Sequence, residues 1–330
     1  MLPPSGRRRS WAHYGVMMPG LPEPHRAFGV MSIVGTPGVR LFDNEALITT
    51  TPNDTAYVVS ATSSMTTGQF RAYRIGADCE FAADGSRLRF GDDLVIEGRH
   101  PTFTVHRTHP EVPVELELEA TRAVTHFVRI PGVYRHWSVL CRARGRVGAA
   151  GVAGLCTLEY ASGVGLHSVM DRRLPVTLPA SFFTYHVLNV DEETQLLFTY
   201  VLGPAGLPVQ QAVHVRRVDG TSATHRRGHG FVVHEYEPHP RTTPDGRSMR
   251  LPRRFTWRVT DPRIEVHGTT TGDFTYGLGA GYVGTYDFEG TFDTRKISGC
   301  AYLEYIDRRR KRPYVSIAGS GTSLRVIAIP

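Results

Sequence analysis

The chain has 330 residues, of which 41% are hydrophobic and 21% are charged, and its formal net charge is +7 at pH 7. These values are ordinary for a globular protein, and the length allows two domains or one large domain. No stretch approaches the roughly 18 consecutive apolar residues of a transmembrane helix, so no membrane-spanning segment is predicted. The arginines that dominate the charge are spread along the chain, which indicates solubility or an anionic neighbour rather than a particular fold.

Residues 1–26 are rich in proline, arginine and glycine, and we predict that they form an arm over the surface. Their arginines are not followed by an apolar run, so we expect no signal peptide. The four cysteines include no CxxC pair of the kind found in metal and redox sites. We therefore expect a reduced, cytoplasmic protein with free thiols.

After residue 26, apolar and polar residues alternate with a period of two, which is typical of half-buried strands. In the first half this alternation predicts strands over residues 56–64, 69–75, 87–98, 102–108, 113–122 and 136–147. A charged, proline-bearing stretch over residues 167–180 interrupts the pattern, and there we divide the chain into domains 27–170 and 171–330. In the second half the alternation predicts strands over residues 181–190, 194–203, 209–218, 229–238 and 253–261.

No segment of about ten or more residues shows a convincing helical period. Many short strands separated by turns are typical of a β-sandwich or a β-barrel. Each half is about the size of a small ligand-binding barrel, whose interior is just wide enough for one small ligand. We therefore predict an all-β fold with one antiparallel β-barrel in each half.

A repeated phrase relates the two halves. The stretch GVAGLCTLEY at residues 151–160 matches KISGCAYLEY at residues 296–305, and at the same offset Gly145 falls on Gly290. This match predicts that the same hairpin occurs in two related barrels, with glycine serving the turn and Leu-Glu-Tyr alternating across the wall. A chance match between two strands of similar composition is the alternative.

Three stretches resemble the carotenoid 1,2-hydratase-like superfamily of tandem lipocalin-like (calycin) barrels. They are the repeated glycine and Leu-Glu-Tyr phrase, SFFTYHVLNVDEETQLLFTYVLG at residues 181–203, and GYVGTYDFEGTFDTRKISGCAYLEY at residues 281–305. The likeness covers residues 181–307 well and the first half mainly over residues 137–160. The superfamily's Tyr-Trp-Asp turn is not found in this sequence.

The resemblance implies two lipocalin-like barrels that bind a long apolar molecule within a barrel or where the barrels meet. It implies a cofactor-independent enzyme that hydrates, isomerises or cyclises a polyene or terpenoid after protonating it. Two alternatives stay open, a pericyclase that folds a polyene for cycloaddition and a carrier of hydrophobic ligands without chemistry. Protonation would bring solvent deuterium into the product, whereas a pericyclic reaction would not.

Protonating an alkene needs a carboxylic acid that an apolar pocket keeps neutral, together with aromatic faces that shelter the cation. The candidate acids are aspartates near aromatic residues, in the order Asp54, Asp261 and Asp287. Tyr185 and His186 are candidates for proton transfer, and because they are adjacent on a strand, at most one can face the barrel interior. The aromatic residues expected to bind substrate are Trp137, Trp257, Phe183 and Tyr302. Asp54 is equally suited to cap a turn, and the tryptophans are equally suited to a core.

The repeated Glu159 and Glu304 are interpreted as structural residues. One enzyme rarely needs the same acid in each of two barrels, so we predict that each glutamate pairs with an arginine in its barrel wall. The separation of five residues between His229, His234 and His239 alternates between the faces of a strand, so one strand cannot present them to one metal ion.

The basic run at residues 307–313 is predicted to be a solvated turn, because no aromatic residues or nucleic-acid-binding motif accompany it. The sequence contains no P-loop, GxSxG, GxGxxG or HExxH motif. We therefore expect no metal, no organic cofactor and no nucleic-acid partner. The expected partner is an apolar small molecule, while peripheral contact with a membrane and the oligomeric state are left open.

Overall fold

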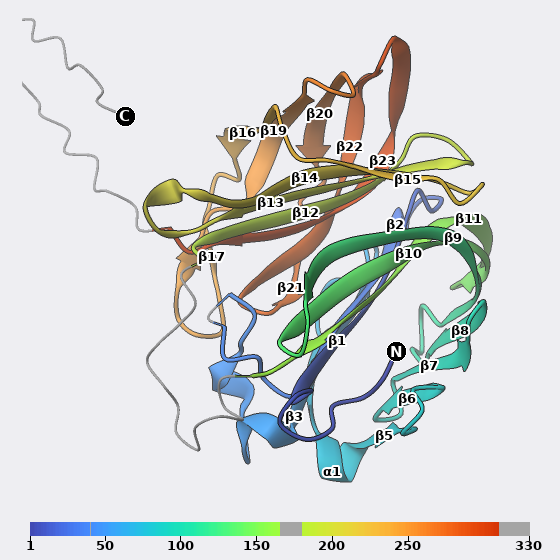
Figure 1. Ribbon diagram of the computed structural model, residues 1–330, viewed down its shortest axis with the longest axis vertical. Helices are drawn as coiled ribbons and strands as arrows, with labels where there is room; N and C mark the ends of the chain where they lie inside the picture. The colour runs from blue at the N-terminus through green and yellow to red at the C-terminus, as the bar shows by residue number, and fades with distance from the viewer. Residues whose placement is uncertain (40, 166–179, 310–330) are drawn as a thin grey trace, which may run out of the picture.

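The computed structural model describes residues 1–39, 41–165 and 180–309 of the chain (Figure 1). Within these residues the protein consists almost wholly of antiparallel strands, and the four-residue α1 (Ile75–Asp78) is the one α-helix. The fold is therefore all-β, as predicted. The predicted boundary at residues 167–180 lies outside the described residues except for Ala180, and so does most of the basic run at residues 307–313.

The first half forms an 11-stranded sheet in the order β4-β3-β2-β1-β11-β10-β9-β8-β7-β6-β5. Its strands are β1 (Trp11–Pro19), β2 (Ala27–Val34), β3 (Thr55–Thr62), β4 (Phe70–Arg74), β5 (Cys79–Phe81), β6 (Arg87–Phe90), β7 (Leu94–Arg99), β8 (Thr102–Arg107), β9 (Val114–Ile130), β10 (Tyr134–Val147) and β11 (Ala150–Gly163). Two 3-10 helices, η1 (Glu45–Leu47) and η2 (Pro52–Asp54), precede β3.

The sheet curls into a nearly closed barrel, because α1 joins its two edge strands β4 and β5. Side chains bridge the seam that remains. Tyr73 of β4 donates a hydrogen bond of 2.6 Å to Asp93, which lies before β7, and Arg71 of β4 binds the same carboxylate. These bonds satisfy part of an edge that would otherwise be open.

The second half forms a 10-stranded sheet in the order β15-β14-β13-β12-β23-β22-β20-β19-β16, with β21 paired to β22. Its strands are β12 (Phe182–Asn189), β13 (Thr194–Leu202), β14 (Pro208–Arg217), β15 (Ser222–His225), β16 (His229–Tyr236), β19 (Pro252–Val259), β20 (Ile264–Thr270), β21 (Thr275–Leu278), β22 (Gly281–Phe292) and β23 (Arg295–Asp307). A separate pair, β17 (Arg241–Thr242) and β18 (Ser248–Met249), and a 3-10 helix, η3 (Pro204–Gly206), complete this half. This second barrel is less closed than the first, because β15 and β16 remain edges.

The predicted N-terminal arm is wrong beyond its first residues. Residues 11–19 form β1, every residue of which is buried, and β1 pairs with both β2 and β11 at the centre of the first sheet. The stretch WAHYGVMMP shows no alternation because both of its faces are covered, and a strand buried on both faces loses the period of two. Composition over residues 1–26 therefore concealed a strand.

The repeated phrase occupies equivalent places in the two barrels. Glu159 lies on β11 and Glu304 on β23, and each of these last strands pairs with the first strand of its own half. The aligned glycines share one structural reason. A side chain at Gly145 would lie 1.9 Å from the Glu115 carbonyl oxygen, and one at Gly290 would lie 1.9 Å from the Glu265 carbonyl oxygen. The match between the halves is therefore structural and not a chance similarity.

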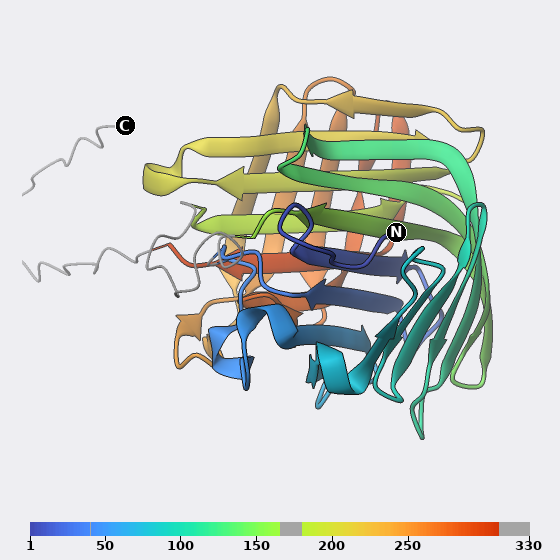
Figure 2. The same cartoon turned by 60° about the horizontal axis from the view of Figure 1, so that its bottom comes forward.

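The two barrels pack wall against wall (Figure 2), with β1 and β2 of the first barrel against β12 and β23 of the second. One hydrophobic core fills the first barrel. The other fills the second barrel and extends into the boundary between them, where it takes in Met17, Met31 and Phe127 from the first half. No helix of the described residues is both long and apolar enough to cross a bilayer.

Candidate active site at the barrel interface

Titratable side chains from both halves meet where the two walls face each other. The first barrel contributes His13 from β1, His136 from β10 and Glu159 from β11, and the second contributes residues of β12 and β23. We call the following six residues the interface cluster: His13, His136, Glu159, Tyr185, Tyr302 and Glu304. All of them except His136 are buried.

Glu159 is at the centre of the interface cluster and is 3% exposed. Its Oε1 accepts a 2.5 Å hydrogen bond from the hydroxyl of Tyr185, across the boundary between the barrels. Its Oε2 lies 3.6 Å from Nε2 of His13 and 3.4 Å from Nε2 of His136. One carboxylate thus contacts side chains from three other strands.

His13 reaches Glu159 because the residue between them has no side chain. Gly15 lies directly opposite Glu159 in the ladder of β1 and β11, and a Cβ there would lie 3.1 Å from Nε2 of His13. On its other side, Nδ1 of His13 lies 2.8 Å from the carbonyl oxygen of Ser32. A carbonyl only accepts, so Nδ1 carries a proton and Nε2 is the nitrogen directed at Glu159.

His136 is the most accessible member of the interface cluster, with 23% of its side chain exposed. Its Nδ1 lies 3.3 Å from the hydroxyl of Tyr134. Phe127 of β9 covers this part of the cluster, since its ring centroid lies 4.5 Å from that of His136 and 5.8 Å from that of Tyr185. Access from solvent is therefore nearest at His136.

Glu304 is 2% exposed and lies beside Tyr185 in the ladder of β12 and β23. The hydroxyl of Tyr302 donates a 3.2 Å hydrogen bond to its Oε1. The Tyr302 ring packs against Gly29 of β2, so this face of β23 is directed at the first barrel. Within the described part of the chain no ion pair involves Glu304.

The equivalent glutamates therefore have opposite electrostatic environments. Burial, and then the charge of Glu159, raise the pKa of Glu304 well above its ordinary value, and the Tyr302 hydrogen bond offsets this only in part. Burial acts in the same direction on Glu159, but the hydrogen bonds and charges of His13 and His136 outweigh it and lower its pKa. These shifts favour the ionised form of Glu159 and the neutral acid of Glu304.

Arg216 of β14 ties the two barrels together behind the interface cluster. It is fully buried, and its guanidinium donates hydrogen bonds of 2.8 Å to Ser138 and 2.7 Å to Thr157 of the first barrel. It also binds Gln195 of β13. Burial lowers the pKa of Arg216, and the nearby Tyr185 and Glu159 act against that lowering. Its positive charge therefore favours the ionised form of Glu159.

The prediction that each repeated glutamate pairs with an arginine in its barrel wall is wrong. Glu159 contacts two histidines and a tyrosine, and Glu304 contacts a tyrosine. Both point out of their own barrels toward the other barrel. A period of two gives two faces to a strand, but it does not identify which face meets a second domain.

The three predicted aspartates lie apart from the interface cluster. Asp54 ends η2, where its carboxylate accepts hydrogen bonds of 2.9 Å from the Gly76 amide and the Thr50 hydroxyl. The Gly76 bond, followed by the Thr50 bond, lowers the pKa of Asp54, which corrects the expectation of a raised value. Asp261 is exposed at the turn after β19.

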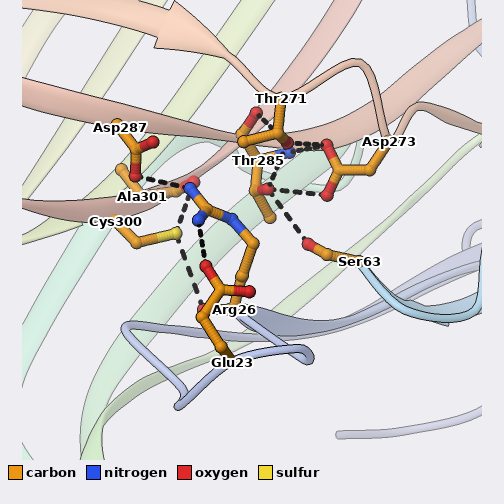
Figure 3. A network of polar contacts seen from close by, with 9 residues as sticks. All are labelled: Glu23, Arg26, Ser63, Thr271, Asp273, Thr285, Asp287, Cys300 and Ala301. Atoms are coloured by element: carbon orange, nitrogen blue, oxygen red, sulfur yellow. Dashed lines mark hydrogen bonds and ion pairs between the residues drawn. The ribbon is translucent and has the colours of Figure 1, made fainter.

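Asp287 is also exposed, and it takes part in a contact between the barrels (Figure 3). Arg26, in the turn between β1 and β2, lies 2.5 Å from both Asp287 of β22 and Glu23. Beside it, Thr285 of β22 bonds Asp273 at 2.6 Å and Ser63 of the first barrel at 3.0 Å. This network joins the rim of the first barrel to the second barrel. Asp287 is therefore part of a structural contact between the barrels.

The predicted aromatic residues are divided among three environments. His186 and Trp257 lie inside the second barrel with ring centroids 5.2 Å apart, and Trp137 lies inside the first barrel against Tyr160. Phe183 contacts Phe42 near the boundary, with ring centroids 5.5 Å apart. Tyr185 and Tyr302 join the interface cluster. As predicted, Tyr185 and His186 point to opposite faces of their strand.

Three features of the site were not predicted from the sequence: His13, the contact of His136 with Glu159, and Arg216. His13 lies within residues 1–26, which are predicted to form an arm, and Arg216 lies within residues 209–218, which are predicted to form a strand with no special role. The repeated Leu-Glu-Tyr was the available signal, because it marks the strand that faces the other barrel in each half. A small pocket lies elsewhere, at the seam of the first barrel beside Arg107 and Asp93, away from the interface cluster.

Comparison with known proteins places these observations in a family. A family model described as a family of unknown function (DUF6670) matches residues 31–316. No curated protein matches the chain by sequence. Among solved structures, a candidate AttH protein from Nitrosomonas europaea has a TM-score of 0.58 at 11% identity, covering 91% of this chain and 92% of that chain. Kievitone hydratase from Nectria haematococca has a TM-score of 0.55 at 10% identity, covering 91% and 89%. At such identities the likeness shows the shared tandem-barrel fold alone.

Proposed function

The chain belongs to DUF6670, a family of unknown function, and we propose that it is a hydratase- or cyclase-type enzyme that protonates an apolar substrate from Glu304. The observation that carries this proposal is a buried carboxyl group to which the described residues supply no cationic partner, set opposite a carboxylate whose pKa is lowered, at a domain boundary. Titratable pairs whose surroundings push their pKa values apart are typical of acid–base sites.

Glu304 suits the role of proton donor because it keeps its proton where an ordinary glutamic acid has lost it. An alkene accepts a proton only from a group that holds one near neutral pH. The rings of Tyr185 and Tyr302 lie beside Glu304 and would shelter the positive charge that forms on carbon. Burial raises the pKa of both hydroxyls, so they remain hydrogen-bond donors.

The fold offers support at the level of analogy. One protein of similar fold is named a hydratase, and pockets at domain boundaries are common ligand sites. The interface cluster is closed in this structure, so a substrate reaches Glu304 only when side chains at the boundary move. His136 and Phe183 are already partly exposed, so moving their side chains exposes less buried surface than moving the fully buried neighbours.

The test begins with the ligand. Organic extraction of the purified protein followed by untargeted mass spectrometry identifies apolar molecules that co-purify with it. Each such molecule is then incubated with the protein in D₂O, and the product is examined for deuterium on carbon. Protonation from Glu304 predicts one deuteron per turnover and loss of turnover in Glu304→Gln with ligand binding retained.

The matched control is Glu289→Gln, which alters an exposed glutamate of β22 and should leave turnover unchanged. A product without deuterium would favour the pericyclase. Tight binding of a ligand that is never converted would favour the carrier. Full turnover in Glu304→Gln would remove Glu304 from the mechanism.

A further inference from the structure

His13, His136 and Glu159 converge on one small volume. They are the one group of three His, Cys, Asp or Glu residues, among residues 1–39, 41–165 and 180–309, whose ligand atoms all lie within 4.8 Å of one another. The distances from Glu159 Oε2 are 3.6 Å to His13 Nε2 and 3.4 Å to His136 Nε2. Ligands about 2.0–2.1 Å from a tetrahedral ion lie roughly 3.3–3.4 Å apart, so these separations are close to those of a metal site.

Hydrogen bonds to neighbouring residues orient His13 and Glu159 as the ligands of a metal ion would be oriented. Metal-binding histidines usually donate their second ring N–H to a carbonyl or carboxylate, which fixes the tautomer that ligates. Nδ1 of His13 donates to the Ser32 carbonyl at 2.8 Å, leaving the Nε2 lone pair directed at Glu159. The other carboxylate oxygen is held by Tyr185 at 2.5 Å, so Oε2 remains for a cation.

The contact between His13 and Glu159 is electrostatically incomplete when His13 is neutral, because the proton of that ring is on Nδ1. A lone pair on Nε2 has no attraction for a carboxylate oxygen at this separation, whereas a cation between them bonds to both. Such a cation is either a proton on a histidine or a metal ion. A metal ion would bond both imidazoles and the carboxylate oxygen at once, whereas a proton on His13 would serve only its own contact with Glu159.

We propose that His13 Nε2, His136 Nε2 and Glu159 Oε2 bind one divalent first-row transition-metal ion of the zinc class. Two histidines and one carboxylate are a common ligand set for such ions, and they leave a coordination position for water or another ligand. The expected absence of a metal, inferred from sequence motifs, is revised by this proposal. The ligands come from three strands, β1, β10 and β11, so no local motif could reveal them.

This site is tested separately from the proposed proton transfer, although a metal ion would offset the charge of Glu159 that also raises the pKa of Glu304. Burial is the leading cause of the raised pKa of Glu304, and it persists whichever cation accompanies Glu159. Metal binding is measured without substrate, and Glu304 is tested by turnover. Failure of either proposal is therefore recognisable by itself.

The experiment uses the full chain after dialysis against a chelator. Zn²⁺ is titrated in competition with a chromophoric chelator, and Co²⁺ is added to a second sample to record visible d–d bands. The variants are His136→Ala, which alters the partly exposed ligand, and Glu159→Gln. The control is His267→Ala, because His267 and Glu265 form an exposed His–carboxylate pair, 3.3 Å apart, in which the described residues supply no third ligand.

We expect one Zn²⁺ per chain, Co²⁺ bands of a nitrogen- and oxygen-ligated site, and a loss of affinity of about 100-fold or more in His136→Ala. His267→Ala should bind as the wild type does. Circular dichroism establishes that the variants are folded, and if Glu159→Gln does not fold, His136→Ala decides alone. Absence of saturable binding in the wild type, or equal binding by wild type and His136→Ala, would overturn the proposal and leave a protonated histidine as the cation.

Discussion

Replacing Glu304 by glutamine separates two accounts of this residue. If Glu304 formed a buried ion pair, replacing it by a neutral residue would lower the free energy of unfolding of the protein by about 3–5 kcal/mol. Among the described residues Glu304 has no cationic partner, so glutamine reproduces the neutral acid in size and in its hydrogen bond from Tyr302. We therefore expect Glu304→Gln to be no less stable than the wild type at neutral pH.

The sign of the pH dependence follows from the raised pKa of Glu304. The folded protein holds a proton that the unfolded chain releases above about pH 4.3, so wild-type stability is fully present below that pH and falls as the pH rises. The loss is about 1.4 kcal/mol per pH unit until the pH passes the raised pKa. Glu304→Gln has no carboxyl group to titrate at this position, so the amount by which its free energy of unfolding exceeds that of the wild type should increase with pH.

Urea unfolding of both proteins between pH 4.5 and pH 8 measures this difference. Glu159→Gln is the internal comparison, because Glu159 occupies the equivalent position in the other barrel but is ionised. It should be destabilised at neutral pH, since the buried carboxylate accepts the Tyr185 bond and neighbours two histidines. A Glu304→Gln variant less stable than the wild type by about 3 kcal/mol or more would refute the reasoning and restore an ion pair.

Three further predictions concern other parts of the structure. Gly15→Ala should destabilise the fold by about 1–3 kcal/mol in urea unfolding, because its Cβ crowds His13, and a stabilised variant would contradict this. Arg216→Met should lower the melting temperature, because Ser138 and Thr157 lose buried hydrogen bonds at about 1–3 kcal/mol for each unsatisfied group; an unchanged melting temperature would mean that water replaces the guanidinium. His186 has a pKa that burial lowers to about 3, so wild-type stability falls as the pH drops below its ordinary value of about 6.5, and His186→Phe should lose less stability between pH 7 and pH 5; equal losses in both proteins would contradict the assignment.

Much of the fold could be read from the sequence. Alternation with a period of two identified most strands of both halves, because a half-buried strand records its two faces directly in its residues. The repeated phrase marked the last strand of each barrel, and Gly145 and Gly290 were conspicuous because a close backbone approach admits no side chain. The opposite orientations of Tyr185 and His186 followed from the same period.

Other features depended on tertiary structure. β1 escaped detection because neighbours cover both of its faces, and with it His13 was missed. Asp54 was chosen as an acid because it stands beside aromatic residues in sequence, yet two hydrogen bonds at the surface lower its pKa. Proximity along the chain does not determine burial.

The two repeated glutamates show this division most clearly. The sequence alone established that Glu159 and Glu304 occupy equivalent places, because the residues around them match. The opposite directions of their pKa shifts result from the packing of one barrel on the other, which surrounds Glu159 with His13, His136 and Tyr185 and buries Glu304 beside Tyr302. A pKa depends on the groups within a few ångströms, and here most of those groups come from strands that are distant in sequence.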